Sequence, residues 1–409
     1  MPAIRLRLGA FSAVLALLAA TTSPSVAQKK YDIGASDSEI KIGNIMPYSG
    51  AASAYGVIGK TEEAYFRKIN AEGGINGRKV TFISYDDAYT PPKTVEQARK
   101  LVESDEVLLI FNSLGTPPNS AIQKYMNQKK VPQLFVATGA TKWNDPREFP
   151  WTMGWQPNYQ SESIIYAKYI LKNKPDAKIA VLYQNDDYGK DYLKGFKDGL
   201  GAKAASMIVA EDSYEVTEPT IDSHIVRLKA SGADVFFNIT TPKFAAQAIK
   251  KNAELNWHPL HFLNNVSGSI GSVIKPAGFE NAQDIISSQY FKDPTDPQWK
   301  TDKAMIAWNE FLDKYYPEAN RADASVMYAY IVSQGLVHVL KACGDDLTRE
   351  NVMKQAASIR DYEPGGLLPG VKVNTSATDF APLSQLQLIR FKGQTWERFG
   401  DILSGDVGG

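Results

Sequence analysis

The sequence predicts an α/β protein made of two doubly wound lobes, and three observations lead to that fold class. Short apolar strands alternate with amphipathic helical patterns along most of the 409 residues. The alternation forms two consecutive runs, residues 40–140 and 178–263, each as long as one doubly wound domain. Three irregular segments, residues 151–157, 285–293 and 364–373, are the expected chain crossings, so we expect a hinge of three segments.

The first run opens with a strand, a Ser/Gly turn, an amphipathic helix closed by Gly73 and Gly74, and a strand that ends in acidic residues. This order is typical of a parallel sheet, in which small molecules bind beyond the carboxyl ends of the strands. The predicted strands are residues 41–46, 79–85, 107–111, 133–136, 178–184, 204–209, 235–239 and 261–263. The predicted helices are residues 56–71, 93–104, 120–129, 159–173, 187–200, 220–231, 243–255, 297–315 and 322–342. Two apolar segments near the C-terminus, LSQLQLIRF and QTWERF, predict a short β-rich tail.

Each crossing takes the chain from one lobe to the other, so each lobe is expected to contain two separate segments. The predicted domains are residues 1–27 as a signal peptide, 28–155 with 286–367 as lobe 1, and 156–285 with 368–409 as lobe 2. The repetition concerns the order of elements, because the two halves share no close sequence identity.

The N-terminus predicts export from the cytoplasm. Arg5 and Arg7 precede an apolar run, residues 8–20, which is short for a membrane span. The Ser-Val-Ala sequence at residues 25–27 supplies the small residues that a signal peptidase recognises. We therefore expect cleavage before Gln28 and a periplasmic, soluble mature protein, because no later stretch has the apolar character of a membrane span. An uncleaved membrane anchor is the alternative.

Composition and motif content disfavour several classes of function. The 45 basic and 45 acidic residues balance, which does not favour nucleic acid or an anionic membrane surface as a partner. Cys343 is the only cysteine and lies in an apolar helical pattern, so we expect a buried structural thiol. His258 and His261 lack the helical context and the neighbouring cysteines of a metal site. No nucleophile or phosphate-loop motif occurs, so we expect no catalytic residue, no metal and no cofactor.

Six segments resemble, in their order, those of one protein family: PYSGAASAYG, INAEGGINGR, YDDAYTPPKTVEQARKLV, SLGTPPNSA, VPQLFVATGAT and VLYQNDDYGKDY. From residue 40 onward the chain looks like the type I periplasmic solute-binding proteins of ABC importers, in the branch of the leucine/isoleucine/valine-binding proteins. The resemblance implies two Rossmann-like lobes that close on a small ligand and deliver it to an ABC permease in the inner membrane. The branch covers aliphatic amino acids, amides, urea and aromatic carboxylates, so the ligand stays open between an amino acid and another carboxylate. We also expect a monomer.

Two loops of lobe 1 are candidates for binding the ligand carboxylate. Ser113 and Thr116 lie between a strand and a helix, where free N–H groups, the Thr116 hydroxyl and the helix dipole favour an anion. Thr138, Ala140 and Thr141 follow the neighbouring strand and offer hydroxyl and carbonyl contacts. By resemblance these loops hold the carboxylate and the amino group of an amino acid. An ordinary Ser/Thr helix cap is the alternative.

Aromatic and amide side chains complete the predicted ligand-binding set. Tyr55 and Tyr188 match the family positions that place a ring against the ligand, and Tyr290 is a further ring near the expected cleft. Thr240 and Asn265 lie in loops of lobe 2 where amino-acid binders supply a tyrosine and an acid. Neither loop contains a carboxylate here, and burying an ammonium without a counter-charge is costly. This departure favours, in part, a carboxylate without the amino group, such as an aromatic acid.

Acidic residues close to these loops have a structural interpretation. Asp86 and Asp87 end a strand and are expected to orient loops rather than contact a ligand. Asp187 is expected to be the N-cap of the helix that follows it.

Three functions are compatible with these patterns. The favoured one is the capture subunit of an importer, in which two lobes close on one solute. A secreted enzyme, such as a hydrolase with a carboxylate pair in the cleft, is the alternative from a different class. A ligand-sensing partner of a membrane receptor would use the same fold.

Overall fold

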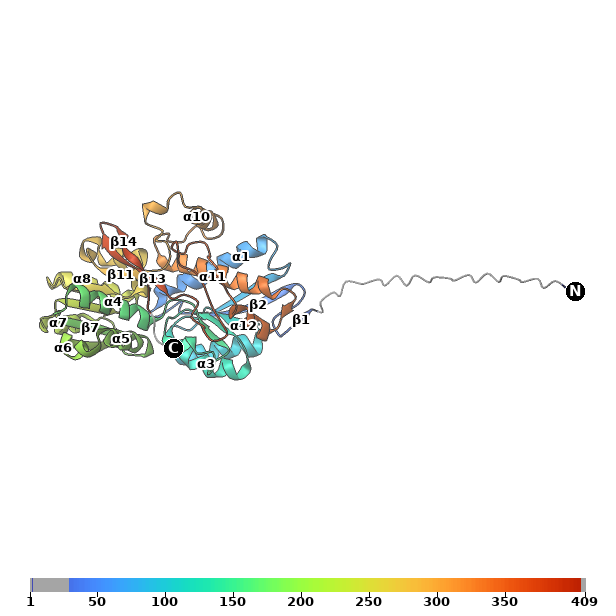
Figure 1. Cartoon of the computed structure of the whole chain (residues 1–409), viewed down its shortest axis with the longest axis horizontal. Coiled ribbons are helices and arrows are strands. Elements are labelled where there is room, and N and C mark those ends of the chain that lie inside the picture. Colours follow the sequence, from blue (N-terminus) through green and yellow to red (C-terminus); the bar gives the residue numbers. More distant parts are fainter. Residues whose placement is uncertain (1, 3–28, 406–409) are drawn as a thin grey trace.

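The computed structural model describes residue 2 and residues 29–405, and Figure 1 shows two lobes side by side. Apart from residue 2, the predicted signal peptide lies outside the described residues. Each lobe has a central, mainly parallel sheet covered by helices (Figure 1). The predicted fold class, an α/β protein of two doubly wound lobes, is confirmed.

Lobe 1 is built on a parallel sheet whose strand order, in the described part of the chain, is β3-β2-β4-β5-β6. Its strands are β2 (Glu39–Met46), β3 (Lys79–Asp86), β4 (Leu109–Phe111), β5 (Gln133–Val136) and β6 (Thr152–Gly154). Its helices are α1 (Val57–Ala71), α2 (Pro91–Arg99) with a π-helical extension η2 (Lys100–Ser104), α3 (Thr116–Lys129), α10 (Lys303–Tyr315), α11 (Ala324–Cys343) and α12 (Arg349–Ala356). The last three come from the C-terminal part of the chain, and α1 packs against both α10 and α11.

Lobe 2 is built on a mixed sheet with the described strand order β14-β13-β11-β10-β9-β7-β8. The parallel strands are β7 (Ile179–Gln184), β8 (Ile208–Tyr214), β9 (Val235–Ile239), β10 (Leu260–Leu263) and β11 (Ile286–Gln289). The antiparallel hairpin of β13 (Gln385–Lys392) and β14 (Thr395–Ser404) extends the sheet beyond β11. The helices are α4 (Tyr159–Asn173), α5 (Asp187–Leu200), α6 (Ala204–Met207), α7 (Asp222–Ala230), α8 (Pro242–Glu254) and α9 (Lys275–Ala277).

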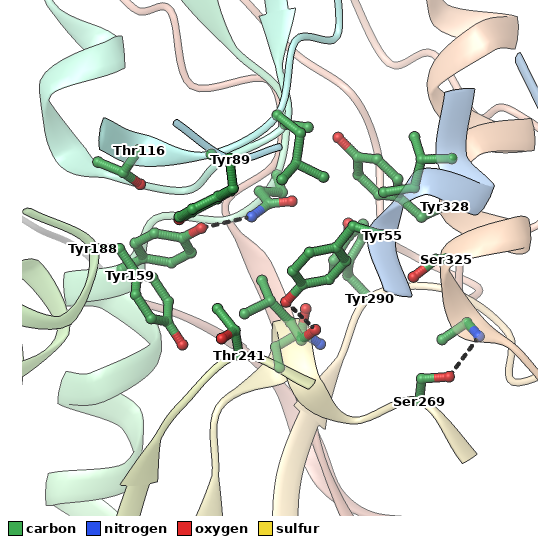
Figure 2. Close-up of a pocket in the computed structure, with 18 of the residues that line it drawn as sticks. Tyr55, Tyr89, Thr116, Tyr159, Tyr188, Thr241, Ser269, Tyr290, Ser325 and Tyr328 are labelled. Carbon is green, nitrogen blue, oxygen red and sulfur yellow. Dashed lines mark hydrogen bonds between the residues drawn. The ribbon is translucent and has the colours of Figure 1, made fainter. Parts of the chain in front are cut away.

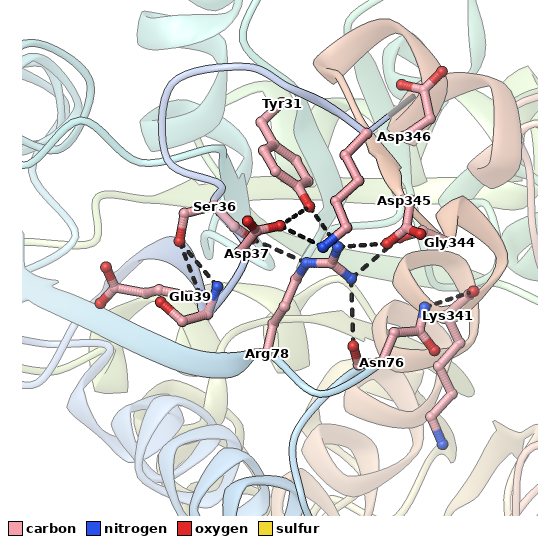
Figure 3. A network of polar contacts seen from close by, with 12 residues as sticks. Tyr31, Ser36, Asp37, Glu39, Asn76, Arg78, Lys341, Gly344, Asp345 and Asp346 are labelled. Carbon is pink, nitrogen blue, oxygen red and sulfur yellow. Dashed lines mark hydrogen bonds and ion pairs between the residues drawn. The ribbon is translucent and has the colours of Figure 1, made fainter. Parts of the chain in front are cut away.

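A polar network fastens the N-terminal segment to lobe 1 (Figure 3). The short strand β1 (Lys30–Tyr31) pairs with β12 (Asp346–Leu347), which follows α11. Beside this pair the buried Arg78 guanidinium donates to Asp345 Oδ1 at 2.6 Å and to the Tyr31 hydroxyl at 2.7 Å. Because Arg78 directly precedes β3, this network lies at the amino ends of the strands, opposite the sheet edge where a ligand is expected.

The predicted strand at residues 204–209 is wrong. The structure has the short helix α6 there, and β8 begins at Ile208. β8 is one of the two edge strands of the described sheet and carries Glu211 and Asp212 at positions that keep some exposure. An edge strand tolerates such charges, so a search for apolar runs places it too early in the chain.

The predicted start of the second lobe 1 segment, at residue 286, also differs from the structure. Residues 286–289 form β11, which pairs with β10 and β13 inside the sheet of lobe 2. The segment looked irregular because its side chains are polar, yet all four residues are buried. Ser288 Oγ lies 3.0 Å from the Tyr166 hydroxyl oxygen, so this strand residue has a polar partner inside the core.

Helix α11 is a core element that contacts both the first helix of lobe 1 and a chain crossing. It is long and apolar enough to span a membrane, contrary to the prediction, but 78% of its most apolar stretch is buried inside the protein. Gly335 lies against the Trp155 ring, where an added Cβ would come within 2.6 Å of a ring carbon. Near the end of the helix, Cys343 is buried as predicted, and burial raises the pKa of its thiol to about 12.

Candidate functional site

A cavity of about 660 Å³, which includes its opening to solvent, lies between the lobes at the carboxyl ends of the strands. Figure 2 shows side chains from both lobes facing this space. Aromatic rings dominate the described wall: Tyr55, Tyr89, Tyr159, Tyr188, Tyr290, Phe291 and Tyr328. Its polar side chains are Thr116, Gln156, Thr241, Asn265, Ser269 and Ser325. Within residues 29–405, no Asp, Glu, Lys, Arg or His lines the cavity.

Helix N-termini surround the cavity because each helix begins where a strand ends or a crossing returns. Thr116 is the first residue of α3, Tyr159 the first of α4, and Tyr188 the second of α5. Thr241 is the N-cap of α8, and Ser325 lies in the first turn of α11. The positive ends of these helix dipoles therefore point toward the same space.

Four of the nine predicted ligand-binding residues line the cavity: Tyr55, Thr116, Tyr188 and Asn265. The Tyr55 hydroxyl donates to the Val266 carbonyl of lobe 2 at 2.9 Å. Thr116 Oγ1 lies 2.5 Å from Thr138 Oγ1, so the two hydroxyls share a hydrogen bond at the wall. The ring of Tyr188 meets that of Tyr159 edge to face, with centroids 5.5 Å apart.

The other five predicted residues do not line the cavity. Ser113 donates its hydroxyl proton to Asn119 Oδ1, and Thr240 donates to Asn238 Oδ1. Thr138 lies one layer behind Thr116, and Ala140 is buried beside it. Thr141 is at the contact between the lobes, where its N–H and hydroxyl donate to Asp191 of α5 at 2.9 and 3.0 Å.

The start of α3 offers fewer N–H donors than the sequence suggested. Pro117 and Pro118 have no N–H, and the Asn119 N–H donates to the Gly115 carbonyl. Among the described groups of this turn, the Thr116 N–H and hydroxyl are therefore the donors near the cavity. Gly115, at φ +100°, is required because a Cβ there would lie 2.5 Å from the Tyr89 ring.

Acidic residues near the cavity orient the backbone. The prediction for Asp87 is confirmed, and the prediction for Asp187 is not. Asp87 accepts from the Tyr89 N–H at 2.8 Å and from the Thr94 hydroxyl at 2.7 Å, and it thereby directs Tyr89 to the wall. The predicted N-cap Asp187 is wrong. Asp186 caps α5 by accepting from the N–H groups of its first turn, whereas Asp187 forms an ion pair with Lys142 of lobe 1 at 2.9 Å.

A buried carboxylate, Glu162 of α4, supports the wall from behind. It accepts from the Tyr166 and Tyr192 hydroxyls, both at 2.7 Å, and from the Asn265 N–H at 2.6 Å. Burial raises its pKa to about 7, although these three donors favour the charged form. Glu162 therefore holds the loop that carries Asn265 and Val266.

Sequence reasoning missed several wall residues for identifiable reasons. Tyr89 lies in a loop with a left-handed backbone, at φ 59°, which no periodic pattern indicates. Tyr159 and Tyr328 belong to helices, where an aromatic residue is typical of core packing. Tyr290 was expected near the cleft and does line it. No group of three or more His, Cys, Asp or Glu in residues 29–405 is arranged to hold a metal ion.

The fold and this cavity between hinged lobes define a two-lobed binding protein. A family model described as periplasmic binding protein matches residues 39–395, and the chain belongs to that family. The predicted recognition is thus confirmed, and the family is one of binding proteins and not of enzymes.

Named relatives and solved structures agree with this assignment. A Leu/Ile/Val-binding protein homolog 2 from Brucella abortus is 26% identical over 340 residues, covering 81% of this chain and 85% of the relative. A branched chain amino acid ABC transporter protein from Thermus thermophilus, solved with bound valine, matches with a TM-score of 0.80 at 15% identity, covering 90% of this chain and 96% of its own. A fatty acid ABC transporter substrate-binding protein from Thermomonospora curvata matches with a TM-score of 0.75 at 20% identity, covering 92% and 95%. At such identities the two structures show the fold alone.

Proposed function

We propose that this protein is the periplasmic solute-binding subunit of an ABC importer, which captures a small amino acid or carboxylate and delivers it to a permease in the inner membrane. The observation that carries the proposal is the interlobe cavity, whose wall comes from both lobes and from the segments between them. Binding there would link the stability of the closed form to the presence of solute.

Direct contacts between the lobes support a closing mechanism. The Tyr55–Val266 hydrogen bond, the Thr141–Asp191 hydrogen bonds and the Lys142–Asp187 ion pair all join the two lobes around the cavity. Each such polar contact contributes little free energy by itself, so a solute that touches both walls can shift the balance between open and closed forms.

The names of similar proteins support a small carboxylate as the solute, and they leave open whether it is an amino acid. Relatives in Brucella are named for leucine, isoleucine and valine, one structural neighbour holds valine, and another is named for fatty acids. Family membership favours binding over the hydrolase alternative, because the matched family consists of binding proteins.

Export, domain organisation and oligomeric state are parts of the same proposal. We propose removal of residues 1–27, which N-terminal sequencing of the exported protein would test by giving Gln28 as the first residue. We also propose that the mature protein is a monomer. The return of α10–α12 to lobe 1 and of β13–β14 to lobe 2 supports the proposed discontinuous lobes.

The test begins with the solute itself. Mass spectrometry of small molecules released from the purified, denatured protein should identify a retained solute. Isothermal titration of solute-free protein with that compound should show a 1:1 complex. The compound should also raise the melting temperature of the protein in a thermal unfolding experiment, as mass action requires. Turnover of the compound by the protein, or no binding of any amino acid or carboxylate, would contradict the proposal.

A further inference from the structure

We infer that the solute bound in the interlobe cavity is an aromatic monocarboxylate without an ammonium group. The inference rests on the proposed function and narrows the solute class for that same site. It depends on the charge of the described wall, on the helices around it and on its ring content.

The charge of the wall argues against an ammonium group. No acidic side chain in the described chain lines the cavity. The nearby acids are bound to protein donors: Asp186 caps α5, Asp323 caps α11, and Glu162 accepts three hydrogen bonds. A buried ammonium would therefore lack a free counter-charge, which is costly.

The surrounding helices favour an anion. Helices α3 and α8 come from opposite lobes and begin at the cavity, and no described side chain caps either N-terminus by a hydrogen bond. The positive ends of these two helix dipoles would attract a carboxylate and repel a cation, although prolines in both first turns leave few free N–H groups there. Tyrosine faces can also attract a cation, but here that attraction would act against the field of several helix N-termini.

Two tyrosine hydroxyls supply directed donors. The Tyr159 hydroxyl accepts from Gln156 Nε2 at 3.1 Å, and the Tyr328 hydroxyl accepts from Asn112 Nδ2 at 2.8 Å. Neither hydroxyl proton has an acceptor among the described side chains of the wall, so each can donate to a ligand oxygen. With Thr116, these groups can satisfy a carboxylate without a cationic side chain.

The ring content favours an aromatic ligand body. Figure 2 shows Tyr159 and Tyr188 on one side of the space and Tyr55, Tyr290 and Tyr328 on the other. Such rings provide large, rigid contact surfaces that pack against another ring in edge-to-face or offset geometry.

The test compares ligands that differ by one group. Solute-free mature protein is titrated with 3-phenylpropanoate and L-phenylalanine, which share a skeleton and differ in the ammonium group. The uncharged 3-phenylpropanamide tests the need for a carboxylate, 4-methylpentanoate and L-leucine form a second matched pair, and benzoate, phenylacetate and 4-hydroxycinnamate widen the range of rings. We expect at least one aromatic acid to bind at least ten-fold more tightly than L-phenylalanine, L-leucine and the amide.

Each other result overturns the inference. Tighter binding of L-leucine or L-phenylalanine would show an ammonium subsite, and Asp323→Asn would then identify Asp323 as its partner if it abolished that preference. Equal binding of the amide would show that a carboxylate is not required. Tighter binding of 4-methylpentanoate than of every aromatic acid would show that the site does not favour an aromatic ligand. If none of these compounds binds while mass spectrometry recovers a different amino acid or a non-aromatic carboxylate, the inference fails and the proposed function stands. No retained or bound solute of any kind would count against both.

Discussion

At the residue scale, the site depends on a few side chains whose neighbours decide what they can do. Thr116 and Thr141 were both expected to contact the ligand, and both carry hydroxyls in similar loops. The structure places Thr116 on the cavity wall and Thr141 in the contact with Asp191. The two residues should therefore affect binding by different routes.

Replacing Thr116 by Val should weaken binding of a carboxylate solute by about 1–3 kcal/mol, because a donor to a buried anion is lost. Titration calorimetry measures the change, and thermal unfolding checks that the variant is folded. Thr220→Val makes the same chemical change at an exposed position outside the wall and should leave affinity unchanged. An unaltered affinity for Thr116→Val would remove this residue from the ligand contacts.

Glu162 should make stability depend on pH. An ordinary glutamate has a pKa of 4.5, whereas the pKa of Glu162 in the folded protein is about 7. The native state therefore binds the Glu162 proton more tightly than the unfolded state does. The free energy of unfolding should thus fall as pH rises from about 4.5 to about 7, by about 3 kcal/mol from this group. Urea unfolding across that range should show a flatter slope for Glu162→Gln than for the native protein. Parallel slopes would mean that Glu162 does not hold its proton in the folded state.

At the element scale, α11 determines how the crossing at Trp155 meets lobe 1. The helix is buried along most of its length, and Gly335 makes room for the Trp155 ring. Its first two turns supply Ser325 and Tyr328 to the cavity, so the same helix contributes to the core, contacts the crossing and lines the site.

Gly335→Ala should therefore destabilise the protein by about 1–3 kcal/mol, because the added methyl overpacks a contact that an indole ring already fills. Chemical denaturation measures the loss. The double variant Gly335→Ala/Trp155→Phe should recover part of it relative to Trp155→Phe alone, since the smaller ring leaves space. A higher free energy of unfolding for Gly335→Ala than for the native protein would contradict this prediction, because it would show that the Trp155 ring can shift without loss of stability.

At the scale of the whole molecule, polar contacts at several places around the cavity join the two lobes. Thr141, Asp187 and Asp191 take part in these contacts without lining the cavity. These three residues can therefore be varied without changing a residue of the cavity wall, whereas Tyr55 both lines the cavity and joins the two lobes.

Thr141→Val should weaken binding of every solute by a similar factor, equivalent to about 0.5–1.5 kcal/mol, because it removes one hydrogen bond of the closed form. Small-angle scattering with a subsaturating solute should show a larger radius of gyration than for the native protein. Lys142→Ala removes an exposed ion pair at the same interface and should have a smaller, salt-dependent effect. A loss of affinity confined to one solute would instead place Thr141 in direct contact with that ligand.

Much of the fold could be predicted because its elements are encoded locally. Strands such as β2, β5 and β9 are apolar runs, and helices such as α4 and α5 are bounded by polar caps and glycine or proline. The polar strand β11 and the charged edge strand β8 were misplaced, because hydrogen bonds and sheet position offset their lack of apolar character.

For the site, the sequence by itself determined the class of protein and the loops that follow the strands. The order of strands, helices and motifs along the chain and the residues of each loop can be read directly from the sequence. Only the tertiary structure decided which loop residues reach the cavity. The Tyr89 ring lies on the cavity wall because Asp87 accepts a hydrogen bond from the Tyr89 N–H and because Gly115 has no Cβ to clash with the ring. Tyr328 lines the cavity because α11, from the C-terminal part of the chain, packs in lobe 1. Such contacts depend on residues distant in sequence, so no local pattern can specify them.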